Sequence, residues 1–421
     1  MDSVIFHVDV NSAFLSWEAA YRIHHLGGSL DIRNIPSAVG GSIEARHGII
    51  LAKSIPAKKY GITTGMPVTE ARSKCPDLYF VPPNYTLYQK CSKAFKEILR
   101  EYTPHVEEYS IDEAFMDMSS TYKLFGNSPL EVAKIIKNRI KSELGFTVNV
   151  GISSNKLLAK MAGEFNKPDN ANTLYPEEVV EKMWPLQVGE LFYVGRATKR
   201  KLLNLGITTI GQLAAADVGF LRQHLKMQGE LVWAYANGID NSCVQTSTME
   251  QKGYGNSTTI SFDVDNFETA QIVLLGLSET VAARLRKDNV EANVIAVGIK
   301  SFDLSYQSHQ MQIPNPTNIT KEIFQYACQL FNDQWDKRPI RHLSIHTSRV
   351  KTDSGIRQMN FFETDDYQKL KCWDTTVDRV RGRYGNDSLK RAPFIKRKVD
   401  HMEGGISREK RKLDYKSLKV E

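Results

Sequence analysis

The stretch EEYSIDEAFMDMS, residues 107–119, places two neighbouring acids, Asp112 and Glu113, between two short runs of alternating apolar residues. Alternation with a period of two is typical of strands, and a turn near residues 110–113 predicts a hairpin over residues 105–118. Ionised side chains are normally avoided where a chain forms its core. Either these acids are solvated turn residues, or a charged partner accompanies them.

The same alternation opens the chain. One face of residues 4–10 carries only apolar side chains, and the other face carries Asp9, which predicts a strand with a second acid inside it. The segment NSAFLSWEAAYRI, residues 11–23, predicts a helix directly after this strand. The chain therefore begins with a strand and a helix, and an acid lies near the junction.

A strong helix signal follows the hairpin. Ser128 is the expected N-cap, Pro129 the first helical residue and Gly145 the stop, so we predict a helix between them. A strand, FTVNVGIS, and a helix, NKLLAKMAGEF, complete an α+β unit of ferredoxin-like βαββαβ order, with about eighty residues inserted after its first helix. In one sheet of this topology the first strand and the hairpin are neighbours, so we expect Asp9 and Asp112 to meet.

The remaining chain is less regular before a second unit begins. The insert is rich in Gly, Lys and Arg, residues 170–238 indicate short helices, and the polar stretch NSCVQTSTMEQK indicates a linker. From about residue 386 onward the chain is basic and poor in core-forming residues, so we expect it to be partly disordered. A second βαββαβ pattern, a predicted binding platform, has its strands and helices at residues 257–264, 269–287, 293–300, 305–313, 320–337 and 340–350.

Bulk composition limits the class of protein. The chain has 421 residues, 41% of them hydrophobic and 24% charged, which favours two to four domains of a soluble protein without a membrane span or a signal peptide. Five widely spaced cysteines argue against a disulfide framework and favour a reducing cytoplasm. The net charge of +7 is weak support for a nucleic-acid partner, because residues 379–421 alone hold 14 Lys/Arg against 6 Asp/Glu.

Three carboxylates at one sheet edge would repel one another unless a cation lies among them. Oxygen ligands suit Mg²⁺ or Mn²⁺, and a pair of such ions could activate a hydroxyl and neutralise a leaving pyrophosphate. From the residues alone this hypothesis and that of solvated acids are about equally favoured.

Three segments carry a family resemblance: VIFHVDVNSAF, EEYSIDEAFMD and GISSNKLLAKMAGEFNKPD. Together they resemble the active-site segments of the Y-family, translesion DNA polymerases, in the bacterial DNA polymerase IV and mutagenesis-polymerase group. The resemblance spans residues 1 to about 390. It implies a palm at 1–18 and 78–168, fingers at 19–77, a thumb at 169–238, a linker at 239–252, a little finger at 243–350 and a clamp-binding peptide with a basic tail at 351–421.

By this resemblance, Asp9, Asp112, Glu113 and the backbone carbonyl of Val10 hold two Mg²⁺ ions, for which Mn²⁺ could substitute. A primer 3′-hydroxyl would attack the α-phosphate of a deoxynucleoside triphosphate on primer-template DNA. Low fidelity, no proofreading and a monomer are implied as well. Two alternatives stay open: a catalytically weak or silent DNA-binding or clamp-binding accessory protein, and a two-metal nuclease.

Nucleotide contacts are also implied by the resemblance. Phe14 matches the ring that excludes a ribose 2′-hydroxyl, and backbone N–H groups near Ala13 and Phe14 would hold phosphates. Lys167 matches a triphosphate-binding lysine. Ile55 and Lys58 replace the family's usual Tyr and Arg, so Lys58 keeps a positive charge without the two-pronged guanidinium, whereas Ile55 cannot donate a hydrogen bond.

Two further segments match weaker motifs. VGRATKRKLLNLGITTIGQL resembles a helix-hairpin-helix, in which Gly195, Arg196 and Lys199 would contact the DNA backbone. RQMNFFET resembles the peptide through which bacterial polymerases bind the sliding clamp. Its predicted clamp contacts are Gln358, Met359, Phe361 and Phe362.

Overall fold

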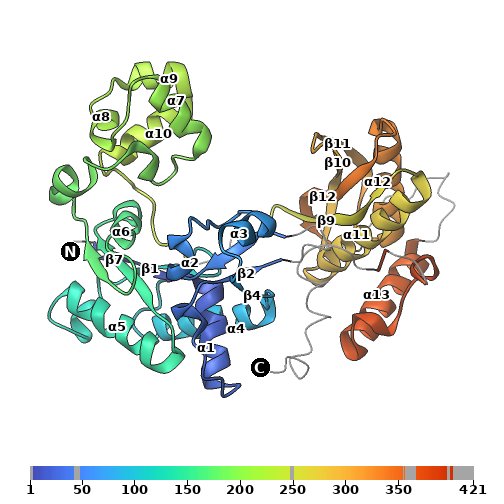
Figure 1. Ribbon diagram of the computed structural model, residues 1–421. Helices are drawn as coiled ribbons and strands as arrows, with labels where there is room; N and C mark the ends of the chain where they lie inside the picture. Colours follow the sequence, from blue (N-terminus) through green and yellow to red (C-terminus); the bar gives the residue numbers. More distant parts are fainter. Residues whose placement is uncertain are drawn as a thin grey trace. The chain divides into compact units, whose positions relative to one another are not determined.

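The chain folds into two compact units, shown in a computed structural model in Figure 1. The first comprises Met1–Gly40, Ile50–Met66 and Glu70–Thr248; the second comprises Met249–Glu421 with the short segments Gly41–Ile49 and Pro67–Thr69. The structure describes residues 3–41, 48–246, 251–353, 355, 367–395 and 399–401.

A five-stranded sheet organises the first unit. Its order is β5-β6-β1-β7-β8, and β1 is antiparallel to both of its neighbours, which confirms the predicted βαββαβ unit with the first strand between the hairpin and the later strand. The strand β8 extends the sheet beside β7, to which it is parallel. The strands are β1 (Ile5–Val10), β5 (Val106–Glu108), β6 (Glu113–Asp117), β7 (Val148–Ser153) and β8 (Ala171–Thr173).

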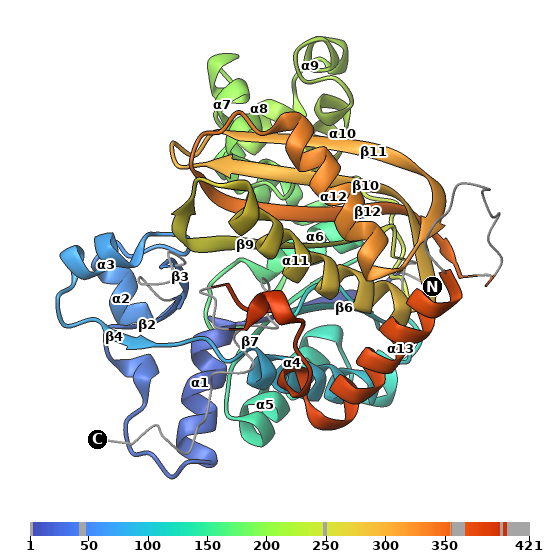
Figure 2. The same ribbon diagram turned by 90° about the vertical axis from the view of Figure 1, so that its right-hand side faces the viewer.

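Helices cover both faces of this sheet. The apolar face of β1 packs into the main core with α1 (Ala13–His24), α4 (Tyr85–Arg100) and α5 (Pro129–Leu144), which lie together on one side in Figures 1 and 2. The face that bears Asp9 is covered by α6 (Lys156–Gly163), because Ile5 packs there against Ala159. Asp9 therefore lies on the face of β1 that α6 covers.

The helix α5 begins and ends where the sequence predicts. Ser128 accepts a hydrogen bond from the amide of Glu131, Pro129 is the first helical residue, and Gly145 takes a left-handed conformation with φ of 75°. A glycine tolerates this conformation without steric cost, which explains the stop. The helix α4 has no counterpart among the predicted elements.

The predicted insert contains a small sheet of order β3-β2-β4. The sheet and its flanking helices comprise η1 (Ile32–Asn34), β2 (Ser37–Gly40), β3 (Ile50–Lys53), α2 (Ile55–Lys59), α3 (Val68–Lys74) and β4 (Tyr79–Val81). The predicted short helices of residues 170–238 are also present around a separate apolar core. They are η3 (Pro176–Glu178), η4 (Val179–Met183), η5 (Val188–Glu190), α7 (Arg196–Asn204), α8 (Ile210–Ala214), α9 (Val218–Leu225) and α10 (Met227–Ala236).

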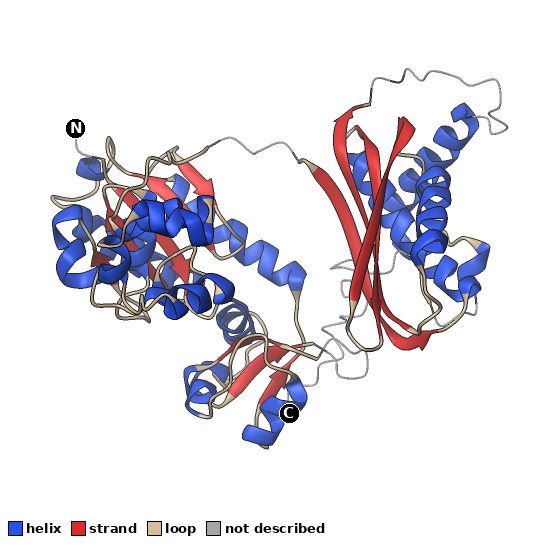
Figure 3. Cartoon of the chain, turned by 90° about the horizontal axis from the view of Figure 1, so that it is seen from above, coloured by secondary structure: helices blue, strands red, loops and turns tan. Residues whose placement is uncertain are grey.

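The second unit confirms the second predicted βαββαβ pattern, but its strands pair in a different order from those of the first unit. The sheet order is β11-β10-β12-β9, so the first strand lies at an edge here and in the centre of the first sheet. Helices α11 and α12 cover one face, as Figure 3 shows. The elements are β9 (Gly253–Val264), α11 (Phe267–Lys287), β10 (Val290–Ser301), β11 (Tyr306–Thr317), α12 (Thr320–Gln334) and β12 (Ile340–Thr352).

Residues 386–395, at the start of the stretch for which the sequence predicts partial disorder, contain regular elements. The helix α13 (Tyr367–Tyr384) is followed by η6 (Asn386–Ser388) and η7 (Ala392–Phe394). Phe394 and Val399 are each only 4% exposed and belong to the core of the second unit. This segment lacks apolar periodicity, yet a few apolar side chains reach a core that other elements form.

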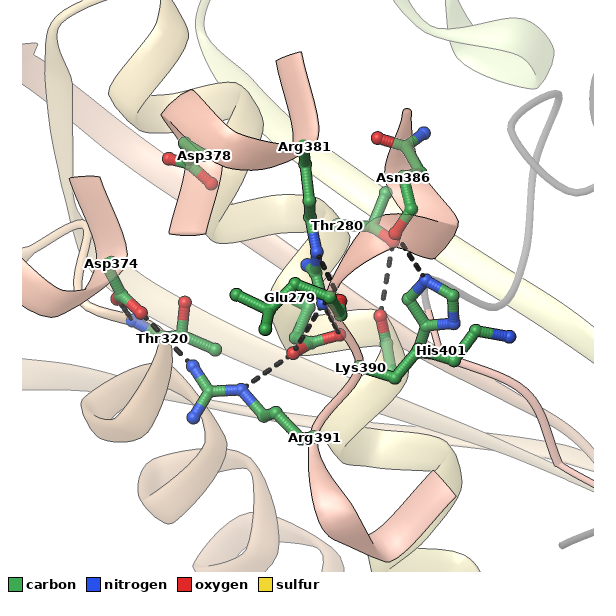
Figure 4. A network of polar contacts seen from close by, with 12 residues as sticks. Glu279, Thr280, Thr320, Asp374, Asp378, Arg381, Asn386, Lys390, Arg391 and His401 are labelled. Carbon is green, nitrogen blue, oxygen red and sulfur yellow. Dashed lines mark hydrogen bonds and ion pairs between the residues drawn. The ribbon is translucent and has the colours of Figure 1, made fainter. Parts of the chain in front are cut away.

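Buried ion pairs also attach this segment (Figure 4). Glu279 of α11, 2% exposed, accepts a 2.6 Å hydrogen bond from Arg391 and lies 3.4 Å from Arg381 of α13. Asp374 of α13 likewise pairs with Arg391 and with Arg286 of α11, each at 3.1 Å. The segment is therefore held to α11 by charges that are largely shielded from water.

Two further observations concern the chain as a whole. Across the described ranges, no helix combines the length and the apolar character needed to cross a membrane. All five cysteines are free thiols.

Candidate active site

The acids predicted to meet lie at two paired strands, Asp9 on β1, Glu113 at the start of β6 and Asp112 in the turn just before β6. Asp9 of β1 is directly opposite Glu113 of β6 in the antiparallel register, and the amide of Val10 donates to the carbonyl of Asp112 at 3.0 Å. The Ser110 hydroxyl accepts hydrogen bonds from the amides of Asp112 and Glu113 at 3.3 and 3.1 Å, which shapes the turn between β5 and β6. A strand pair and a hydrogen-bonded turn thus hold the three acids at one edge of the sheet.

Each acid has its own partner in this structure. The Lys167 ammonium lies 2.5 Å from Asp9, the Lys160 ammonium lies 2.7 Å from Glu113, and the Ser110 hydroxyl donates to Asp112 at 2.7 Å. Their ligand atoms do not all lie within 4.8 Å of one another. Within the described residues, only Asp387, Asp400 and His401 of the second unit form a group of three that tight.

The electrostatic environments of Asp9 and Glu113 differ. Burial raises the pKa of Asp9 to about 6, although the charge of Lys167 opposes this shift. Burial also disfavours ionisation of Glu113, but contacts with His7 and Lys160 outweigh it and lower the pKa to about 2. Burial lowers the pKa of His7, so this ring is neutral at pH 7. Glu113 is therefore ionised over the whole neutral range of pH, whereas burial makes ionisation of Asp9 less favourable even beside Lys167.

These residues fit a divalent metal. Carboxylate and carbonyl oxygens are the ligands that hard cations such as Mg²⁺ and Mn²⁺ prefer. Two lysine ammonium groups already contact Asp9 and Glu113, which shows that the acids favour positive charge at this edge. The predicted donor set is Asp9, Asp112, Glu113 and the carbonyl of Val10.

Lys160 is a part of the site that was not predicted. Its side chain is 11% exposed and its ammonium lies 5.2 Å from the ring centre of Tyr109, 5.0 Å from that of Phe192 and 3.4 Å from His7 Nε2. In the sequence, Lys160 stands among apolar residues of an amphipathic helix, and this position was the signal that could have indicated a buried lysine. Its partner could not be identified, because the pairing depends on how α6 packs on the sheet.

Phe14 lies in an aromatic cluster at the start of α1. It is half-buried, and its ring stacks on Tyr88 with centroids 4.5 Å apart and planes 8° apart. Tyr85 meets the same ring edge-on at 6.2 Å and Trp17 is tilted against it at 5.9 Å. The ring is therefore held on several sides while part of it remains accessible.

The helix that carries Phe14 begins at Ala13, two residues later than the start of the predicted helix at residue 11. Ser12, before it, takes a left-handed conformation with φ of 48°, and its side chain makes no capping hydrogen bond. The first amides of a helix have no partner within the helix. The first turn of α1 can therefore donate to a bound anion.

The other predicted nucleotide contacts, Lys167, Ile55 and Lys58, do not all lie beside the acids. Lys167 joins the acids, since its ammonium contacts Asp9 and, at 2.8 Å, Glu164. Ile55 and Lys58 lie on α2, a separate element, and both side chains are exposed. The structure thus brings Lys167, and neither residue of α2, into contact with an acid of the site.

The predicted helix-hairpin-helix lies in the helical segment. Gly195 is the N-cap of α7, and Arg196 and Lys199 on the first turns of this helix are exposed. The turn to α8 contains Gly206 with φ of 78°. The predicted clamp contacts Gln358, Met359, Phe361 and Phe362 lie outside the described residues.

Comparisons with known proteins agree with this geometry. The profile of the impB/mucB/samB family matches residues 8–164, and the profile of its C-terminal domain matches residues 251–361. A DNA polymerase IV of Clostridium acetobutylicum is 47% identical over 94% of this chain and 99% of its own length. One from Acetivibrio thermocellus is 39% identical over 94% and 98%, and DNA polymerase IV 2 of Bacillus subtilis is 37% identical over 94% and 95%.

A solved structure agrees as well. The fold matches that of the Y-family DNA polymerase chimera Dbh-Dpo4(243-245)-Dbh with a TM-score of 0.71 over 83% of this chain and 99% of the chimera, at 22% identity. That likeness concerns the fold alone. Together with the family profiles and the similar sequences, it shows that the chain belongs to the impB/mucB/samB family, and hence to the Y-family DNA polymerases.

Proposed function

We propose that this polymerase adds deoxynucleotides to a primer 3′-hydroxyl at the edge formed by Asp9, Asp112 and Glu113. The observation that carries the proposal is the register of Asp9 opposite Glu113, with a half-buried aromatic ring, Phe14, on the helix that follows Asp9. Acids for a metal suit a polymerase and a two-metal nuclease alike, but only the polymerase needs a ring that selects the sugar. Template-directed synthesis of low fidelity, without proofreading, completes the proposal.

The domains have separate roles in this proposal. The first sheet and its helices act as a palm, the small sheet as fingers, the helical segment as a thumb and the second sheet as a little finger that binds DNA. The proposed ranges are 1–18 with 78–168 for the palm, 19–77 for the fingers, 169–238 for the thumb, 239–252 for the linker, 243–350 for the little finger and 351–421 for the clamp-binding segment and tail.

The three acids and the carbonyl of Val10 would hold two Mg²⁺ ions, or Mn²⁺ in their place. Such ions lower the pKa of an attacking hydroxyl and neutralise a leaving pyrophosphate. The chain itself fixes Asp9 and Glu113 on paired strands and Asp112 in the turn before β6, which preorganises them. Lys160 keeps Glu113 oriented through a 2.7 Å contact.

The nucleotide would be held by groups around α1. The first amides of this helix, at Ala13 and Phe14, would donate to the triphosphate, and the helix start favours its negative charge. Lys167 and Lys58 would add positive charge, whereas Ile55 offers only an apolar contact. Phe14 would exclude the ribose 2′-hydroxyl because its stacked ring cannot retreat without displacing Tyr88.

DNA and clamp contacts are the outer parts of the proposal. The exposed amide and cations of Gly195, Arg196 and Lys199 would contact phosphates of the primer-template duplex. Gln358, Met359, Phe361 and Phe362 would bind the sliding clamp. We propose a monomer in the cytoplasm, where five free thiols are expected to remain reduced.

Primer extension with Mg²⁺ and four deoxynucleotides tests the catalytic site. Asp112→Ala and Glu113→Ala should abolish extension while duplex binding persists, because the acids are needed for chemistry and the cations that contact DNA are untouched. Asp117→Asn is a matched control, since Asp117 lies on the same strand opposite Ile5. Extension at the wild-type rate in either alanine variant would exclude this site, and shortening of the primer would indicate a nuclease.

Sugar selection tests Phe14 separately. Phe14→Ala should admit ribonucleotides, since it removes the ring that would meet the 2′-hydroxyl. Unchanged discrimination between deoxynucleotides and ribonucleotides would mean that another residue excludes the ribose.

A further inference from the structure

The ring of Phe14 rests on a tyrosine that is completely buried. Tyr88 has no exposed surface, and its ring lies parallel to that of Phe14 at 4.5 Å. The two residues come from α1 and α4, which pack side by side in both ribbon views (Figures 1 and 2). Any movement of Phe14 toward α4 therefore requires Tyr88 to move first.

Tyr88 is anchored by a buried carboxylate. Its hydroxyl donates a 3.1 Å hydrogen bond to Oε1 of Glu18, which lies one helical turn after Phe14 on α1 and is 1% exposed. The Nε of Arg22, one turn further, lies 3.7 Å from the other carboxylate oxygen. A buried hydroxyl and a buried carboxylate each need a polar partner, and here each is a partner of the other.

The environment of Glu18 indicates that an apolar residue would be easier to place there. Its neighbours Trp17 and Ala19 are completely buried, and burial raises the pKa of the Glu18 carboxyl to about 7 against the opposing contacts of Tyr88 and Arg22. Keeping a carboxyl at such a position costs stability. What the protein gains is a fixed tyrosine ring behind Phe14.

We infer that Glu18 is a positioning residue for sugar selection: by holding the Tyr88 hydroxyl it fixes the ring on which Phe14 rests. This inference rests on the proposed role of Phe14 in the polymerase site. When the hydroxyl loses its acceptor, Tyr88 and Phe14 can shift together toward α4, and space opens for a 2′-hydroxyl. Glu18 itself has no need to touch the nucleotide.

The experiment compares two substitutions of similar size. Glu18→Gln keeps an oxygen that accepts from Tyr88, and Glu18→Met does not, while both remove the charge. The ratio of kcat/KM for a deoxynucleotide to that for the matching ribonucleotide should fall about fivefold in Glu18→Met, the effect of one neutral hydrogen bond, and stay near the wild-type value in Glu18→Gln. Tyr88→Phe removes the same bond from the other side and should give the same fall, with no further loss in the double variant.

Tyr102→Phe is the matched control. Tyr102 is 6% exposed and lies just beyond the end of α4, about 20 Å along the helix from Tyr88. Its hydroxyl is far from Phe14, so sugar discrimination should not change, and melting temperatures of all variants separate loss of stability from loss of selection.

Two outcomes separate the inference from the proposed function. If Phe14→Ala relaxes discrimination while Glu18→Met and Tyr88→Phe retain it, Glu18 has no positioning role and the proposed site stands. If Phe14→Ala itself has no effect, the proposed role of Phe14 fails first. Should Glu18→Met not fold, the contrast between Tyr88→Phe and Glu18→Gln decides, and equal discrimination in these two overturns the inference.

Discussion

Replacing Gly151 with alanine should disturb both the fold and the chemistry of the first unit. Gly151 lies in the middle of β7, where α6 approaches the sheet most closely. A Cβ atom at this position would stand 1.9 Å from the carbonyl oxygen of Ala159 and 2.3 Å from the amide nitrogen of Gly163. Both are backbone atoms, so no side chain can rotate to relieve the overlap.

The size of the effect follows from this geometry. Contacts of a Cβ below 3.0 Å essentially never occur, so α6 has to move away from the sheet by more than an ångström. Overpacking of this kind costs about 3 kcal/mol, which corresponds to a fall of roughly 5–10 °C in the melting temperature of the first unit. Lys160 moves with α6 and leaves Glu113, and a misplacement of about 1 Å can lower kcat by about a hundredfold.

Thermal unfolding and single-nucleotide primer extension measure the two effects of Gly151→Ala. Gly382→Ala is the control, because no atom lies within 4 Å of the added Cβ and alanine favours the interior of α13 by about 0.5–1 kcal/mol. A Gly151→Ala protein with the melting temperature and kcat/KM of the wild type would refute the close packing of α6 on β7.

Three other changes have defined outcomes. Burial raises the pKa of the Asp9 carboxyl from 3.8 to about 6, so the metal-free fold binds this proton more tightly than the unfolded chain does and loses stability as the pH rises from about 4 to 6. Asp9→Asn should therefore be more stable than the wild type by roughly 2 kcal/mol in urea unfolding at pH 8 with EDTA, and equal urea midpoints of the two proteins would contradict this. Glu279→Ala leaves the buried Arg381 without its carboxylate partner and should cost about 3–5 kcal/mol in urea unfolding, against less than about 1 kcal/mol for Asp303→Ala at an exposed pair; similar losses would argue against the buried network. Phe394→Ala should lower the unfolding free energy of the second unit by about 3 kcal/mol, whereas no loss of urea resistance would mean that this ring does not belong to the core.

Much of the fold could be predicted because its signals are local. Ser128, Pro129 and Gly145 lie within or beside the helix they delimit, so its bounds follow from a few adjacent residues. That Asp9 lies close to the hairpin could also be predicted, because the βαββαβ order places the first strand beside the hairpin. In both cases the order of residues along the chain is enough to determine which residues or strands are neighbours in the fold.

Other parts could not be predicted because their partners are distant. The buried residues of α13 include Asp374 and Arg381, which would normally indicate a solvent-facing surface, and their burial is explained by ion pairs with α11 and by contacts with Arg391 and Leu389. The pairing of Lys160 with Glu113 likewise depends on how a helix packs on a sheet. Charge partners across a fold leave no periodic pattern, so the sequence alone does not reveal them.

The central strand of the first sheet has a consequence for synthesis of the protein. β1 leaves the ribosome more than a hundred residues before its partners β6 and β7. At about 5–20 residues per second, β1 has to wait roughly 5–20 s before it can form a sheet. An interrupted chain that stops before Val148 cannot complete the pairing, so unfinished copies of this protein should lack the assembled sheet that carries Asp9 and Glu113.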